Sequence, residues 1–236
     1  MDKSKILSDP ELRRFSGQLS LPQVGLEGQE KLKKAVVAVV GAGGLGSVVL
    51  QYLASVGVGH LGIIDYSMVE EKNIQRQVLY GGNDLGKLKA IISKQQLQNV
   101  FPLVNFEIIN IQLTSNNVER ILAPFSVVVD ATNNHDSHLM IIEACKRLKI
   151  PMIFGKVSGL NGEVGVSHSD ACLESEKEGK DKCAANDFLK GTISVTYGLV
   201  GNLVAFETLK VITGDPGAVI NKKLCIDLLN YQFVVK

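Results

Sequence analysis

The sequence contains no tryptophan, and only 6% of its 236 residues are aromatic. Its four cysteines form no C-x-x-C pair, so no disulfide framework is expected, and a reducing, cytoplasmic environment is the default. Positive and negative charges nearly cancel, at a net +1, which gives no reason to expect nucleic acid or an anionic membrane as a partner. No apolar run spans a membrane without interruption, and the polar N-terminus does not resemble a secretory signal.

What the sequence does contain is a strand, glycine turn, helix and strand in succession. The β-branched run Val36–Val40 is typical of a strand buried on both faces of a parallel sheet. The glycine-rich segment 41–46 follows at once, and residues 47–56 have apolar side chains at helical spacing. A second apolar strand over residues 61–64 ends at Asp65.

This order of elements predicts a nucleotide site. Glycines let backbone N–H groups approach phosphate oxygens, and a helix N-terminus carries partial positive charge toward them. An acid at the end of the next strand is placed to accept hydrogen bonds from ribose hydroxyls. The alternative is that the glycines serve only close packing of helix on strand. The candidate residues are Gly41, Gly43, Gly44, Gly46 and Asp65.

Strands and helices alternate across residues 36–155, which predicts an α/β fold with a Rossmann-like, doubly wound, mainly parallel sheet. We expect one domain over residues 1–236, with a nucleotide-binding core at about 30–166. The charged segment at about 167–190 is expected to be a mobile crossover loop. Residues 191–236 are expected to form a helix and a C-terminal strand hairpin.

Charged residues follow the strand ends. Asp65 and Asp130 come directly after apolar strands, and Arg76 and Lys89 lie in the connection after Asp65. Each alone could be a surface charge or a helix cap. Cleavage of ATP needs cations around the triphosphate and usually an acid for Mg²⁺, whereas hydride transfer by a dehydrogenase needs fewer charges. The set therefore favours an ATP site, with Arg76, Lys89 and Asp130 as its candidate catalytic residues.

Several segments together resemble the ThiF/MoeB/HesA family, relatives of the ubiquitin-activating enzymes, over roughly residues 11–235. The most specific is Asn73-Ile74-Gln75-Arg76-Gln77, which separates the family from ordinary NAD dehydrogenases. The others are Arg14–Gln18, Gly28-Gln29, Gly41–Gly46, Tyr52–Gly59, Asp65, Asp84–Lys89 and Asp130–Asn134.

The resemblance implies an ATP-dependent adenylyltransferase. Such an enzyme joins AMP to the C-terminal glycine carboxylate of a ubiquitin-like sulfur-carrier protein and releases pyrophosphate, in thiamine or molybdopterin sulfur transfer. ATP and Mg²⁺ are the implied cofactors, and the implied partners are a carrier ending in Gly-Gly and a second copy of the chain. Nucleic acid and membrane are not expected.

The resemblance also implies roles for individual residues. The Gly43–Gly46 backbone cradles phosphate, Asp65 holds the ribose, and Lys89 neutralises the phosphates. Arg76 stabilises the departing pyrophosphate, and Asp130 binds Mg²⁺. The full nucleotide-contacting set is Gly41, Gly43, Gly44, Gly46, Asp65, Asn73, Arg76, Gln77, Lys89, Asp130 and Ala131.

The chain departs from the family pattern at several positions. Gly17 stands where the family has an arginine that reaches the partner subunit's ATP, and Asn133 stands where the Asp-x-Thr-Asp-Asn pattern has its second acid. The two C-x-x-C pairs of many members are absent, so we expect no zinc site. His135 and His138 are interpreted as loop and helix-start residues.

No cysteine occupies the family's usual acceptor position. We hypothesise that Cys183, flanked by Lys180 and Lys182, forms a persulfide or thioester, because nearby cations favour the thiolate. The alternative is an incidental thiol. Two other functions remain open at this point. One is a tRNA threonylcarbamoyladenosine dehydratase-like enzyme, and the other is a degenerate ATP-binding subunit that needs a partner.

Overall fold

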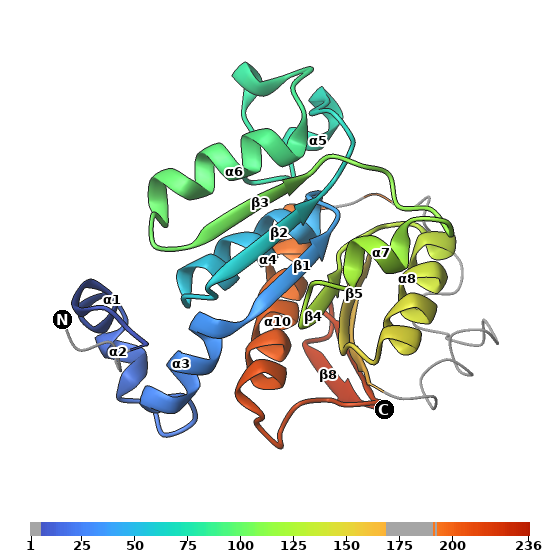
Figure 1. Ribbon diagram of the computed structural model, residues 1–236. Helices are drawn as coiled ribbons and strands as arrows, with labels where there is room; N and C mark the ends of the chain where they lie inside the picture. The colour runs from blue at the N-terminus through green and yellow to red at the C-terminus, as the bar shows by residue number, and fades with distance from the viewer. Residues whose placement is uncertain (1–5, 169–190, 192) are drawn as a thin grey trace.

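The computed structural model describes residues 6–168, 191 and 193–236. Residues 169–190 of the expected crossover loop, with Cys172 and Cys183, lie outside the described residues, and Ser167, expected to begin the loop, is the last residue of a strand. One eight-stranded sheet runs through the described chain in the order β3-β2-β1-β4-β5-β6-β7-β8 (Figure 1). The strands are β1 (Val36–Val40), β2 (His60–Ile64), β3 (Asn105–Ile109), β4 (Val127–Asp130), β5 (Met152–Ser158), β6 (Asn161–Ser167), β7 (Lys223–Asp227) and β8 (Gln232–Val235).

Helices cover both faces of this sheet. The helices α4, α6 and α10 pack on one face, and α7 and α8 pack together on the other (Figure 1). The described helices are α1 (Asp9–Arg14), α2 (Ser16–Leu19), α3 (Gly25–Lys34), α4 (Gly44–Ser55), α5 (Glu71–Ile74), the 3-10 turn η1 (Gly82–Asp84), α6 (Lys89–Val100), α7 (Val118–Leu122), α8 (His135–Leu148) and α10 (Ser194–Thr213).

The central strand β1 shows why the sheet is covered on both sides. Val37 and Val39 belong to the hydrophobic core beneath α4 and α10, whereas Ala38 and Val40 belong to the core beneath α7 and α8. Successive side chains of a strand point to opposite faces, so an apolar run with no polar alternation must be covered on both faces of the sheet. The expected doubly wound sheet is confirmed.

The second half of the sheet is antiparallel. Strands β1 to β5 pair in parallel, and β6, β7 and β8 are each antiparallel to the preceding strand. The pair β7–β8 confirms the expected C-terminal hairpin. Strand β6 was not foreseen, because glycines weaken strand patterns. Its Gly165 is required by packing, since a Cβ there would lie 2.3 Å from the Phe154 ring.

The opening motif of the family is structural in this chain. The side-chain amides of Gln18 and Gln29 both donate to the carbonyl oxygen of Val56, at 2.8 and 3.0 Å. Gly57 follows with φ of +87°, and a Cβ there would lie 2.5 Å from the Phe15 ring. These contacts fasten the N-terminal helices to the end of α4.

Among the described helices, α10 is the one long and apolar enough to cross a membrane by length and composition. It packs against α4, β5 and β6, and 44% of its most apolar window is buried inside the molecule. The helix is therefore a core helix of this sheet.

Candidate nucleotide-binding site

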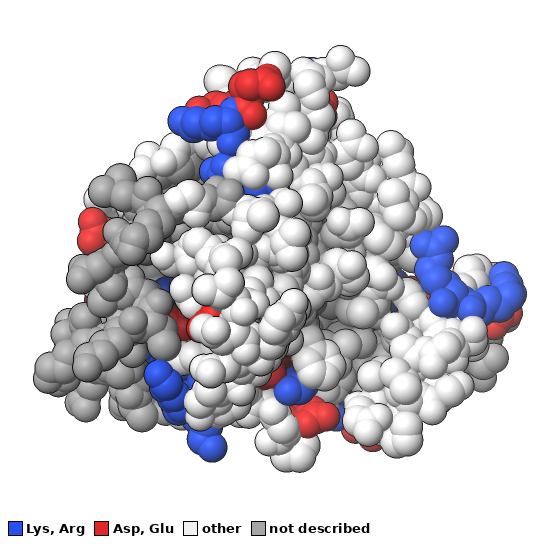
Figure 2. Space-filling view, turned by 180° about the vertical axis from the view of Figure 1, so that it is seen from behind, with Lys and Arg blue, Asp and Glu red and all other residues white. Residues whose placement is uncertain are grey.

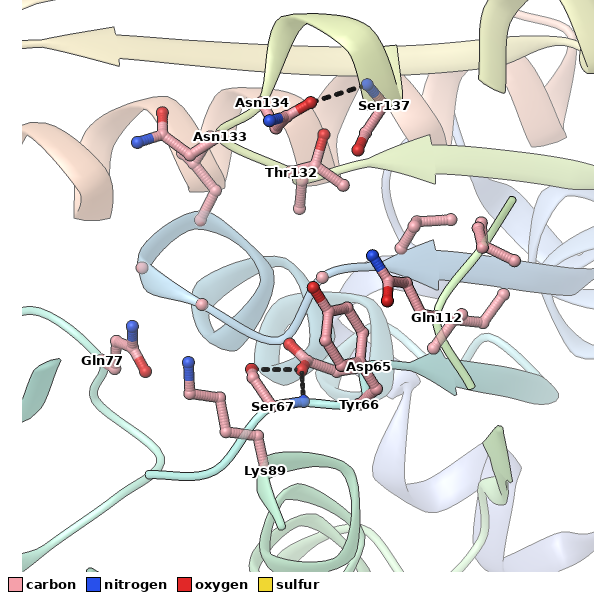
Figure 3. Close-up of a pocket in the computed structure, with 18 of the residues that line it drawn as sticks. Asp65, Tyr66, Ser67, Gln77, Lys89, Gln112, Thr132, Asn133, Asn134 and Ser137 are labelled. Atoms are coloured by element: carbon pink, nitrogen blue, oxygen red, sulfur yellow. Dashed lines mark hydrogen bonds between the residues drawn. The ribbon is translucent and has the colours of Figure 1, made fainter. Parts of the chain in front are cut away.

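A pocket of about 300 Å³ opens at the carboxyl ends of β1, β2 and β4 (Figure 3). This is the edge of a parallel sheet at which ligands bind, where the strand order reverses. Its lining includes Gly41, Gly43, Gly44, Asp65, Tyr66, Ser67, Arg76, Gln77, Lys89, Ile111, Gln112, Leu113, Ala131, Thr132, Asn133, Asn134, Ser137, Ile141 and Tyr197.

The glycine turn forms one wall of the pocket. Gly41 leaves β1 with φ of +90°, a conformation that side chains disfavour. A Cβ at Gly46 would lie 1.8 Å from the Gly41 carbonyl oxygen, so only glycine permits this close turn. Helix α4 starts at Gly44, and its N-terminal amides face the pocket, as in phosphate-binding turns.

Asp65 connects the end of β2 to this turn. Its Oδ2 accepts a hydrogen bond from the Ala42 amide at 2.7 Å. Its Oδ1 accepts from the Ser67 amide at 2.7 Å and from the Ser67 hydroxyl at 2.5 Å. A carboxylate oxygen can accept about two hydrogen bonds, so Oδ2 retains a lone pair for a ribose hydroxyl.

Two cations line the same pocket. Lys89 opens α6 and is only 7% exposed, and burial lowers the pKa of its ammonium while Asp65 and Glu70 oppose the shift. Arg76 donates to the Lys72 carbonyl oxygen at 2.8 Å. A bound polyanion would compensate the buried charge of Lys89.

Tyr197 on α10 ties the arginine to the glycine turn. The Arg76 guanidinium carbon lies 5.9 Å from the centre of the Tyr197 ring, within the range of a cation–π contact. The same ring packs so closely on Gly44 that a Cβ there would lie 2.7 Å from it. The Arg76 cation and the glycine turn are thus held by one side chain.

The opposite end of the pocket is apolar. Ile111 and Leu113 follow β3, Ile141 comes from α8, and the Tyr66 ring lies beside Asp65 (Figure 3). Gln112 brings an amide to this end. The pocket therefore runs from an apolar end, past the Asp65 carboxylate, to a cationic end at the glycine turn.

Asp130, the expected Mg²⁺ ligand, is enclosed. It is 2% exposed and is not among the residues that line the pocket. Its Oδ1 accepts from the Thr132 amide at 2.9 Å and the Thr132 hydroxyl at 2.7 Å, and its Oδ2 lies 2.7 Å from Nδ1 of His138. His138, interpreted from sequence as a helix-start residue, is therefore a buried partner of Asp130.

The residues of this loop that do line the pocket are Ala131, Thr132, Asn133 and Asn134 (Figure 3). Among the described residues, no three acidic, histidine or cysteine side chains come together to hold a metal. Mg²⁺ at nucleotide sites is usually held by one or two carboxylates together with the phosphates, so the role of Asp130 as a Mg²⁺ ligand stays a prediction. Asn134, the neighbour of Asn133, caps α8 by accepting a hydrogen bond from the Ser137 amide at 2.8 Å.

Most of the predicted site residues converge. Gly41, Gly43, Gly44, Asp65, Arg76, Gln77, Lys89 and Ala131 all line the pocket. Gln77 is 3% exposed, and its Oε1 has no hydrogen-bond partner among the described residues. This oxygen can therefore accept a hydrogen bond from a donor group of a ligand. Asn73 is buried, with an equally unpartnered Oδ1, and it does not line the pocket; Gly46 serves the turn from within α4.

Several pocket residues escaped the sequence reasoning. The segment 111–113 follows the end of β3, so the strand-end rule applied to β3 would have found it. Tyr66 directly follows the predicted site residue Asp65, and Thr132 lies two residues after the predicted Asp130. Tyr197 gave no signal, because it is distant in sequence from every other pocket residue.

Comparison with known proteins identifies the family. The ThiF family matches residues 15–235. The chain belongs to the ThiF family. The sulfur carrier protein adenylyltransferase of Thermus thermophilus is 39% identical over 233 residues, which cover 94% of this chain and 86% of the relative. The predicted family is confirmed.

Other relatives are longer than this ThiF-family chain. The probable molybdopterin-synthase adenylyltransferase of Porphyra purpurea is 37% identical, covering 86% of this chain and 55% of the relative. The adenylyltransferase and sulfurtransferase MOCS3 of Culex quinquefasciatus is 36% identical, covering 94% of this chain and 51% of the relative. The chain thus spans about half the length of these two relatives.

Solved structures confirm the fold. The crystal structure of PaaA superposes with a TM-score of 0.83 at 24% identity, covering 100% of this chain and 77% of PaaA. The structure of E. coli MccB with ATP superposes with a TM-score of 0.81 at 21% identity, covering 99% of this chain and 72% of MccB. At these identities the likeness is one of fold.

The glycine turn yields a test with a matched control. We expect Gly46→Ala to lower the free energy of unfolding by about 1–3 kcal/mol, because the new methyl overlaps the Gly41 carbonyl. Gly43→Ala is the control, since a Cβ there meets nothing closer than 3.7 Å. Urea unfolding of both variants checks this, and equal stabilities would contradict the described turn.

Proposed function

We propose that this ThiF-family chain is an ATP- and Mg²⁺-dependent adenylyltransferase that activates the C-terminal glycine carboxylate of a ubiquitin-like sulfur-carrier protein. The observation that carries the proposal is the convergence of the glycine turn, Asp65, Arg76 and Lys89 in one pocket. The names of the relatives, sulfur carrier protein adenylyltransferase and molybdopterin-synthase adenylyltransferase, support the reaction and the substrate class. Thiamine and molybdopterin sulfur transfer are both compatible with this activity.

The pocket supports an ordered placement of ATP. The base occupies the apolar end near Tyr66 and Leu113, and the ribose hydroxyls donate to Asp65. The phosphates lie along the amides of the glycine turn, between Lys89 and Arg76. This arrangement sets the α-phosphorus at the mouth of the turn, where a carboxylate can approach.

The chemistry needs no nucleophilic side chain. A carboxylate oxygen of the carrier's terminal glycine forms a bond to the α-phosphorus, and the bond from that phosphorus to the bridging oxygen of pyrophosphate breaks. The products are an acyl-adenylate and pyrophosphate. Lys89 and Arg76 stabilise the charge that develops on the departing pyrophosphate, and the glycine turn fixes the geometry.

We assign no step to a protein-bound Mg²⁺. Oδ1 of Asp130 accepts two hydrogen bonds from Thr132, and Oδ2 lies 2.7 Å from Nδ1 of His138, so in the proposal this acid positions the loop after β4. Cys183 lies outside the described residues and remains a hypothesis for a later sulfur-transfer step.

The proposal is tested by ATP–pyrophosphate exchange with and without a carrier ending in Gly-Gly. We expect carrier-dependent exchange, and we expect Lys89→Ala to slow it by about 100-fold because one phosphate-binding cation is lost. Lys94→Ala is the control, since this residue lies on the same helix but not in the pocket. ATP binding without exchange would instead favour a subunit that needs a partner.

A second prediction concerns the wall formed by Asn133. We expect Asn133→Asp to strengthen the apparent Mg²⁺ affinity about tenfold, because Mg²⁺ bound to nucleotide phosphates prefers carboxylate ligands. Asn133→Ala, which removes the amide without adding an acid, is the control. Titration of the exchange reaction with Mg²⁺ measures the effect. Identical Mg²⁺ dependence of the two variants would show that this position does not face the metal.

We also propose a homodimer that forms through the α4–α10 face, defined by Tyr52, Val195 and Phe206. These side chains are exposed although they are apolar. Helices α4 and α10 carry two charged residues, Glu207 and Lys210, which pair with each other at 2.7 Å. Figure 2 shows this side of the molecule with charged side chains at its margins and a broad uncharged area between them. An uncharged surface is complementary to its own copy.

Self-association is measurable directly. We expect Phe206→Glu to shift the protein from dimer to monomer in sedimentation velocity, because each interface would bury two unpaired carboxylates. Tyr231→Glu is the control, since Tyr231 is exposed on the hairpin and lies outside this face. A monomeric unmodified protein, or a dimer unaffected by Phe206→Glu, would contradict the assignment.

A further inference from the structure

The peptide groups of Ala42 are held from two sides. The Ala42 amide donates to Asp65 Oδ2 at 2.7 Å, and the Ala42 carbonyl oxygen accepts a hydrogen bond from the Tyr80 hydroxyl at 2.6 Å. Ala42 is fully buried and lies within the glycine turn between Gly41 and Gly43. The two hydrogen bonds therefore fix the direction in which the following amides point.

The direction of the hydrogen bonds around Tyr80 can be deduced. A tyrosine hydroxyl has one proton, and the Ala42 carbonyl can only accept, so Tyr80 donates to it. The Ser93 hydroxyl, 2.9 Å from the Tyr80 oxygen, must then donate to Tyr80. Burial raises the pKa of Tyr80 far above neutrality, so the phenol remains a donor at physiological pH.

Ser93 links this hydroxyl to a second part of the pocket. Ser93 is fully buried on α6, one helical turn after Lys89. Tyr80 itself lies in a small hydrophobic cluster with Val69 and Ile92, and Ile92 also belongs to α6. The helix that carries the pocket lysine and the turn that faces the phosphates are therefore joined through one phenol.

We infer that Tyr80 is a positioning residue for the nucleotide, which orients the glycine turn relative to Lys89 without contacting the ligand itself. This inference rests on the proposed ATP site. Tyr80 is not among the pocket-lining residues, so its action passes through the Ala42 carbonyl. Without the hydroxyl, a buried carbonyl loses its donor, and Ala42 is held only through its amide.

The test is Tyr80→Phe, which keeps the ring in its apolar cluster and removes only the hydroxyl. We expect the dissociation constant for ATP, measured by titration calorimetry, to rise about tenfold, as for the loss of one buried hydrogen bond. We expect the affinity for the carrier to stay unchanged. Amide hydrogen exchange at residues 42–45 should accelerate about tenfold without ligand, because the turn opens more often.

Two further variants keep the outcome decisive. Ser93→Ala leaves the donor to Ala42 in place and should raise the ATP dissociation constant less than Tyr80→Phe does. Tyr231→Phe removes the hydroxyl of an exposed tyrosine and should change neither the ATP dissociation constant nor the amide exchange. If Tyr80→Phe changes neither the ATP affinity nor the amide hydrogen exchange at residues 42–45, the inference is overturned. If the unmodified protein binds no ATP, the proposed function is overturned. If Tyr80→Phe still accelerates amide hydrogen exchange in that case, the dependence of the turn on Tyr80 stands.

Discussion

The geometry of the site depends on the two hydrogen bonds that hold the amide and the carbonyl group of Ala42. Asp65 holds the amide from the end of β2, and Tyr80 holds the carbonyl from the connection to α6. The turn between β1 and α4 is thereby fixed by groups that lie later in the chain. The amides of the turn, the Asp65 carboxylate and the helix of Lys89 share one set of contacts, so their relative positions are fixed without a ligand. Such preorganisation is what a phosphoryl-group reaction requires.

The loop after β4 follows a different design from the one its motif implies. Its acid is turned inward to Thr132 and His138, and the loop residues that line the pocket are Ala131, Thr132, Asn133 and Asn134. A buried carboxylate with hydrogen bonds at both oxygens is stable as a structural anchor. In this chain Asp130 ties β4 to α8 through His138, while the cations that line the pocket are Lys89 and Arg76.

The first half of the fold could be predicted because its signals are local. The apolar run of β1, the glycines and Asp65 follow each other within one unit. Ala131, which also lines the pocket, came from the family resemblance. Tyr80, Tyr197 and His138 could not be found this way, because their roles depend on packing between elements that are distant in sequence. The enclosure of Asp130 was hidden for the same reason, since strand position alone does not say which side chain of a loop faces outward. The antiparallel β6 escaped because its glycines are dictated by packing, Gly165 against Phe154 and Gly162 against Val200, and only the assembled sheet reveals these contacts.

The most direct test of this account is a titration of the protein with ATP, followed by backbone amide chemical shifts in two-dimensional NMR. The account predicts that the largest shifts fall on the amides of residues 43–46, with smaller shifts at residues 65–67 and 111–113. Such a pattern would establish that the glycine turn binds the phosphates and that the apolar end of the pocket binds the base. Saturable binding with shifts confined to residues outside this pocket would contradict it.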